Sequence, residues 1–156
     1  MNFESLYKEF APRIYRLCLG YTNDEDLAKD LMQESLITIW EKLDSFRGES
    51  AIGTWIYRIV SNKCLRHMEV QQRHKRVDIQ FVEEHSYELE DQNLKFLRNC
   101  ISELKEVDRL IIGLYLEEVH QEIIADIVGI SHSNMRVRLH RIKKELSRKF
   151  QHNGRA

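Results

Sequence analysis

Helix-breaking residues are almost absent from this chain. Its 156 residues include one proline, Pro12, and six glycines that are scattered one at a time. Collagen-like chains, linker-dominated chains and turn-rich all-β chains all need many residues of these two types. Their scarcity favours long, uninterrupted helices, so the sequence predicts an all-α fold.

Apolar residues recur at helical spacing in two separate parts of the chain. Residues 3–21 follow the pattern of an amphipathic helix, which Pro12 is expected to kink or restart. A second helix is expected after polar capping residues at 22–25, with an apolar face that includes Ala28, Met32, Leu36, Ile39 and Leu43. A third helix is expected from about residue 51, with Ile52, Trp55, Ile56, Ile59 and Val60 buried.

The apolar period fades after about residue 70 and resumes near residue 94. We therefore predict two small helical domains, at residues 1–70 and 93–150, joined by a flexible linker at 71–92 and followed by a tail at 151–156. An extension of the third helix through Arg76 is the alternative for the start of this linker. Each domain is small enough for its core to be marginal.

The charges are segregated along the chain. The 24 basic residues nearly balance the 25 acidic ones, for a formal net charge of -1. Acids nonetheless predominate at residues 24–34 and 81–92, whereas bases predominate at residues 58–76 and 131–156. Clustered bases bind phosphates, and acidic clusters suit a basic partner. The sequence therefore predicts separate surfaces for different partners.

Several classes of protein are excluded by what the sequence lacks. No apolar stretch approaches the roughly 18 to 20 residues of a membrane span, and the start lacks the features of a signal peptide. We expect a soluble, cytoplasmic protein without membrane insertion. Cys18, Cys64 and Cys100 are odd in number and form no CxxC pair, so we expect three core residues and no metal site. The histidines form no cluster with the spacing of metal ligands. We therefore expect that the protein is not an enzyme and has no cofactor.

The clearest local motif lies at residues 122–131. Ala125 permits a close helix contact, Gly129 suits a left-handed turn, and Ser131 can cap the next helix. This pattern is typical of a helix-turn-helix. The following helix is expected to bury one face and to offer amide, hydroxyl and guanidinium groups to DNA on the other, through Ser133, Asn134, Arg136, Arg138, Arg141 and Lys144. An ordinary helical hairpin with a solvated basic face is the alternative.

Two segments resemble a known family. The sequence DLMQE at residues 30–34, followed by Trp40 and by FRGESAIGTWIYRIVSN at residues 46–62, resembles region 2 of bacterial RNA polymerase sigma factors of the extracytoplasmic-function group. The helix-turn-helix, introduced by residues 104–109, is similar to region 4 of the same sigma-70 family. The resemblance covers about residues 3–70 and 93–150, in the family's order. It implies a region 2 helical bundle and a region 4 helix-turn-helix.

The resemblance also implies a function. Such a protein is a transcription initiation factor, not an enzyme, that binds core RNA polymerase, directs it to promoters and assists their melting. In the family, the second helix docks on the clamp helices of the largest polymerase subunit. The matching exposed residues here are Asp30, Gln33 and Glu34, whereas Met32 and Trp40 are assigned to the core.

The family's third helix and the loop before it recognise the minus-ten element by capturing a flipped base. Phe46 and Asn62 match the residues of that pocket, and Arg58, Lys63 and Arg66 can supply a basic surface. The alternative for Phe46, which we hold equal, is a hydrophobic side chain that anchors the loop to the core. Trp55 and Tyr57 are both aromatic candidates for stacking on bases, but Trp55 is assigned to the apolar stripe.

The helix after the turn matches the family's reader of the minus-thirty-five element. Asn134 and Met135 stand where many members have Thr and Val, which is a departure from the family pattern. The acidic segment at residues 83–91 is either a nucleic-acid mimic, as the family's linker suggests, or a solvating chain.

Two further expectations concern partners and function. The family often has an anti-sigma factor as a further partner. The alternative function is a stand-alone helix-turn-helix regulator whose N-terminal helices form a dimerisation domain.

Overall fold

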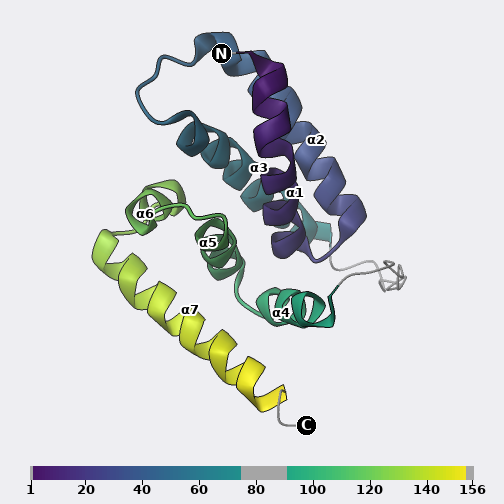
Figure 1. Cartoon of the computed structure of the whole chain (residues 1–156), viewed down its shortest axis with the longest axis vertical. Helices are drawn as coiled ribbons and strands as arrows, with labels where there is room; N and C mark the ends of the chain where they lie inside the picture. The colour runs from purple at the N-terminus through teal and green to yellow at the C-terminus, as the bar shows by residue number, and fades with distance from the viewer. Residues whose placement is uncertain (1, 75–90, 154–156) are drawn as a thin grey trace.

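The computed structural model describes residues 2–74 and 91–153, and within these ranges it contains α-helices, one short 3-10 helix and no strand (Figure 1). Three α-helices form an N-terminal unit and four form a C-terminal unit. The N-terminal unit consists of α1 (Phe3–Thr22), α2 (Glu25–Lys42), the 3-10 helix η1 (Leu43–Ser45) and α3 (Ile52–His74). The C-terminal unit consists of α4 (Gln92–Ser102), α5 (Glu106–Leu116), α6 (Gln121–Val128) and α7 (His132–Asn153).

The first helix continues through its proline. Pro12 was expected to kink or restart the helix; it lies inside a single helix α1, so the restart is wrong. Both Pro12 and Lys8 are exposed, so the Lys8 carbonyl, which loses its usual donor at Pro12, lies on the solvent side of α1. The helix ends where Asn23 adopts a left-handed conformation with φ 51°, and Asp24 then caps α2 by accepting the Leu27 N–H at 3.1 Å.

The apolar face of α2 is narrower than the sequence suggested. Leu36 and Ile39 are buried and Met32 is half-buried, as expected. Trp40, however, is 64% exposed, so its assignment to the core is wrong. Each residue rotates an α-helix by about 100°, which carries Trp40 away from the direction of Ile39 and onto the face of Gln33.

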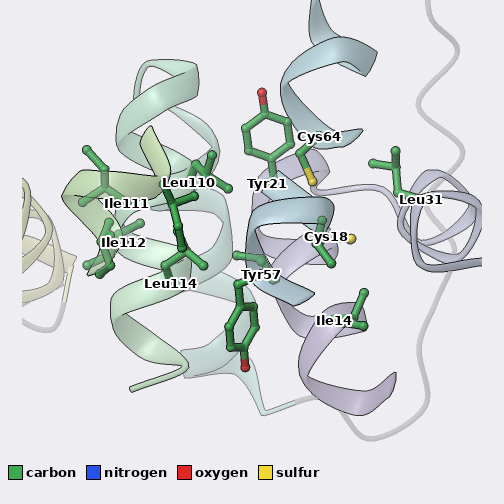
Figure 2. Close-up of a cluster of buried hydrophobic side chains, with 14 of the residues drawn as sticks. Ile14, Cys18, Tyr21, Leu31, Tyr57, Cys64, Leu110, Ile111, Ile112 and Leu114 are labelled. Carbon is green, nitrogen blue, oxygen red and sulfur yellow. The ribbon is translucent and has the colours of Figure 1, made fainter. Parts of the chain in front are cut away.

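The two units pack against each other around one hydrophobic core. Helix α5 lies at the centre of the C-terminal unit and contacts α1 and α3 of the N-terminal unit. Figure 2 shows buried side chains from all three of these helices in a single cluster. Cys18, Cys64 and Cys100 are buried and unbridged, in agreement with their expected place in the core. Burial raises the pKa of the Cys100 thiol.

The chain between the two units is described only at its ends. Helix α3 continues to His74, into the range predicted as a linker, and Asp91 caps α4 by accepting the Asn93 N–H at 2.9 Å. The rest of the predicted linker and nearly all of its acidic segment lie outside the described residues. Within residues 2–74 and 91–153, no helix combines the length and the apolar character that crossing a membrane requires.

Candidate nucleic-acid and polymerase interfaces

The helix-turn-helix has the geometry that its sequence predicts. Ala125 is fully buried in α6, and its carbonyl accepts the N–H groups of Gly129 at 2.9 Å and Ile130 at 3.0 Å. Gly129 has φ 78°, a left-handed conformation that a side chain would strain. The Ser131 hydroxyl accepts the Asn134 N–H at 3.1 Å and so caps α7. These interactions fix the angle at which α7 leaves the turn.

Helix α7 has one buried face and one polar face. Its buried residues are those predicted, namely Met135, Leu139, Ile142 and Leu146. Its exposed residues include five of the six predicted DNA-binding residues, namely Ser133, Asn134, Arg136, Arg141 and Lys144. A helix with a packed face and a basic outer face is suited to the major groove of DNA.

Val137 is an apolar residue that the sequence prediction missed. It is 57% exposed in the second turn of α7. It lies about 200° around the helix from Met135, directly opposite the core and among the exposed polar residues. The signal was present in the sequence, because Val137 falls outside the periodicity of the buried residues on this helix.

Arg138, the sixth predicted reader, has a different environment from the other five. Its Nε and Nη2 groups donate to Asp108 Oδ1 at 3.1 and 2.8 Å, and the side chains are 26% and 20% exposed. Asp108 lies in the first turn of α5. The ion pair therefore ties α7 to α5, and the Arg138 guanidinium is directed towards the protein.

A second polar face lies on α3. Arg58, Asn62 and Arg66 are spaced four residues apart and exposed on one side of the helix, and Lys63 is half-buried beside them. The structure thus brings together all four predicted polar and basic residues of the minus-ten site. Two guanidiniums flanking an amide can contact phosphates and a base edge at the same time.

Aromatic side chains lie at the N-terminal end of this α3 face. Phe46 is half-buried, and its ring centroid lies 5.2 Å from that of Trp55, with 44° between the ring planes. Trp55 was expected to be buried but is only half-buried against the core. It precedes Arg58 by three residues and Asn62 by seven, so it also borders the polar face. Tyr57 is 4% exposed and packs edge-on against Phe10, which removes it as a stacking candidate.

The third surface is the outer face of α2. Asp30, Gln33 and Glu34 are all exposed on it, as predicted. The same face carries two large apolar side chains that were not predicted to lie there, Ile37 at 56% exposure and Trp40 at 64%. Trp40 also lines a shallow hollow of about 530 Å³ between the N-terminus of α1 and the end of α2. An exposed apolar patch with an acidic border is typical of a protein-binding surface.

These features are typical of a helical DNA-binding protein with an additional protein-docking surface, and family comparisons make the class specific. The model of Sigma-70 region 2 matches residues 6–74, and the model of Sigma-70 region 4 matches residues 97–146. The chain belongs to the sigma-70 family of RNA polymerase sigma factors, in the extracytoplasmic-function group. It is therefore a non-enzymatic initiation factor that binds core RNA polymerase and directs promoter recognition. Of the two functions that the sequence left open, the family supports the transcription initiation factor and not the stand-alone helix-turn-helix regulator.

Individual relatives agree with this assignment over most of the chain. The RNA polymerase sigma factor YlaC of Bacillus subtilis is 29% identical over 162 residues, which cover 94% of this chain and 91% of YlaC. The ECF RNA polymerase sigma-E factor of Salmonella typhimurium is 28% identical over 96% of this chain and 86% of its own length.

Two solved structures share the fold. RpoE, in its complex with the anti-sigma factor NepR from Bartonella quintana, has a TM-score of 0.82 at 23% identity and covers 96% of both chains. CnrH, in complex with the cytosolic domain of CnrY, has a TM-score of 0.67 at 18% identity and covers 93% of this chain and 84% of its own. The N-terminal unit is accordingly called region 2 below, and the C-terminal unit region 4.

Proposed function

We propose that the outer face of α2 docks on the clamp helices of the largest polymerase subunit. Asp30, Gln33 and Glu34 supply charge and hydrogen-bonding groups, and Ile37 and Trp40 supply the apolar contact. Interface energy is concentrated in large side chains that become buried, and tryptophan is prominent among them. In this proposal the acids select a basic partner and Trp40 contributes most of the binding free energy.

We propose that α3 and α7 read the two promoter elements. Arg58, Asn62, Lys63 and Arg66, with Phe46 beside them, bind the minus-ten element and hold its melted strand. Stacking on an aromatic ring and hydrogen bonding to an exposed base edge are the interactions that a flipped base requires. The main support for this assignment is that the Phe46–Trp55 ring pair lies at the N-terminal end of the polar α3 face.

The minus-thirty-five reader is the exposed face of α7. Ser133, Asn134, Arg136, Arg141 and Lys144 bind base edges and phosphates in the major groove. Val137 lies at the centre of that face, where an apolar side chain matches the methyl group of thymine. Arg138 supports the reader by fixing α7 to α5 rather than by touching DNA.

The proposal extends to regulation and location. We infer that an anti-sigma factor binds this chain, a hypothesis supported by the two solved structures of similar fold, which are both complexes with such a partner or its cytosolic domain. We also infer that the protein acts in the cytoplasm, where core polymerase and promoter DNA are found.

Run-off transcription with purified core polymerase over a library of promoters tests the main proposal. We expect transcripts only when core polymerase and this protein are both present, with sequence preferences at both elements. Reversing two charges, as Asp30→Lys with Glu34→Lys, should abolish co-purification with core polymerase. The matched control is Glu4→Lys with Glu9→Lys, which changes the same charge on α1. Equal binding of both double variants would contradict the docking assignment.

A further inference from the structure

His140 lies on the outer face of α7 but is not among the proposed DNA-binding residues. It is exposed, and within residues 2–74 and 91–153 it forms no hydrogen bond or ion pair. Val137, opposite the core, marks the centre of the outer face. At about 100° of rotation per residue, His140 lies about 60° from this centre, compared with about 40° for Arg141 and about 100° for Arg136. His140 therefore lies within the arc that carries the proposed DNA-binding residues.

The other histidines of region 4 within the described ranges are placed differently. His132 Nε2 lies 3.3 Å from Asp126 Oδ1, so this ring contacts α6. His120 caps α6, where its Nδ1 accepts a backbone N–H at 3.4 Å. His152 is exposed, but it lies about 18 Å farther along α7 than His140, away from the turn that presents the helix to DNA. His140 is thus the histidine best placed to contact DNA.

The charged side chains beside His140 on its own helix are basic. Arg136 precedes it by four residues, and Lys143 and Lys144 follow it by three and four, so all three are its neighbours on the helix surface. The carboxylates of α4, α5 and α6 that contact α7 are paired with other side chains, namely Glu103 with Lys149, Asp108 with Arg138 and Asp126 with His132. A proton on His140 therefore extends a basic row on the surface of α7.

The geometry of the major groove indicates which part of DNA His140 would contact. The groove is about 12 Å wide, and a helix with its side chains has a diameter of about 10–12 Å, so the helix fills the groove. Side chains at the centre of the outer face then point at base edges, and those towards its sides point at the phosphates of the groove walls. The position of His140, between Val137 and Arg136, favours a phosphate.

We propose that His140 is a further DNA-contacting residue of region 4, whose protonated ring binds a backbone phosphate beside the minus-thirty-five element. The inference rests on the proposed role of α7 as the reader of that element. Histidine changes its charge near neutral pH, and a phosphate favours the charged form. Promoter binding is therefore tighter at pH 6 than at pH 8, because the proton adds one phosphate contact at the lower pH.

Four holoenzymes, each assembled from core polymerase and the full-length chain, test this contact. They carry the wild type, His140→Gln, His140→Lys or His152→Gln, and both positions are exposed, so we expect the fold to be retained. Glutamine cannot take up the proton, whereas lysine is charged at both pH values. His152→Gln is the matched control, because it removes a histidine from the same helix outside the proposed contact. The core enzyme is common to all four, so its own titrating groups cancel when variants are compared.

The salt dependence of promoter affinity measures the number of phosphate contacts. One contact changes the affinity by about 3.5-fold between about 50 and 200 mM salt. At pH 6 we expect this rise in salt to weaken the wild type up to about 3.5-fold more than His140→Gln, and at pH 8 most of this difference should be lost. His140→Lys should differ from His140→Gln by this factor at both pH values, and His152→Gln should follow the wild type.

Three outcomes would overturn the inference. Equal salt dependence of the wild type and His140→Gln at pH 6 would exclude the phosphate contact, and a difference that is as large at pH 8 would exclude the role of the proton. A changed sequence preference of His140→Gln without a change in salt dependence would show a base contact instead. All three leave the wild type sensitive to the minus-thirty-five sequence. Failure of the proposed function differs, because the wild-type holoenzyme would then bind equally well to a promoter with that element scrambled.

Discussion

Removing the Arg138–Asp108 pair should destabilise region 4 without altering which promoter sequence it prefers. Two hydrogen bonds from one guanidinium converge on a single carboxylate oxygen, at 3.1 and 2.8 Å. A buried hydrogen bond to a charged group contributes about 1.5–3 kcal/mol, whereas an exposed ion pair contributes at most about 1 kcal/mol. Since these side chains are 26% and 20% exposed, we expect Arg138→Ala or Asp108→Ala to lower the free energy of unfolding by about 1–2 kcal/mol.

Thermal unfolding and promoter binding together test this reasoning. A loss of this size should lower the melting temperature by about 2–4 °C per kcal/mol for a protein of this length. The two single variants and the double variant form a cycle in which we expect a coupling energy of at least about 0.5 kcal/mol, because the groups touch. The promoter consensus measured on a sequence library should be the same for Arg138→Ala and the wild type.

Arg141→Ala is the contrasting variant. Arg141 is exposed on α7, so its removal should leave the melting temperature unchanged. Promoter affinity should fall by about 1–3 kcal/mol with a changed preference at one base pair, if Arg141 contacts a base. The reasoning is refuted if Arg138→Ala shifts base preference while its melting temperature and that of Asp108→Ala stay at the wild-type value.

Three other predictions concern single side chains. Val137→Ser should weaken the preference for thymine at one position of the minus-thirty-five element, by about 1 kcal/mol in a promoter-library measurement, since it removes an apolar partner for the methyl group. Trp40→Ala should weaken binding to core polymerase by about 2 kcal/mol or more, whereas Leu94→Ala, which removes another exposed apolar side chain from α4, should have no effect. Cys18 and Cys100 should resist iodoacetamide in the native protein at pH 8 and react in urea. A hydrogen bond with Cys64 together with burial raises the pKa of Cys18, and burial raises the pKa of Cys100, so the thiolate fraction of both is low; modification of the native protein detected by mass spectrometry would contradict this.

The helices were predictable because their apolar period is strong and their ends carry capping residues. Gly129 and Ser131 act as their sequence context indicates, through a left-handed turn and a side-chain cap. Residues at the edge of an apolar stripe were harder to place. Trp40 was assigned to the core on its hydrophobicity, although its position follows that of the exposed Gln33 by two helical turns. The pairing of Arg138 with Asp108 was not predicted, because no local pattern reveals a partner 30 residues earlier in the chain.

The packing of the two regions had a signal in α5. Leu110, Ile111, Ile112 and Leu114 point in different directions around the helix, and all four are buried. A helix that is apolar all round must be covered on every side. Helices α4, α6 and α7 cover one part of α5 and α1 and α3 cover another, whereas Tyr115 and Leu116 at its C-terminal end stay exposed. The burial of these α5 residues therefore depends on both regions, which is why the packing of region 4 on region 2 follows from the apolar character of this one helix.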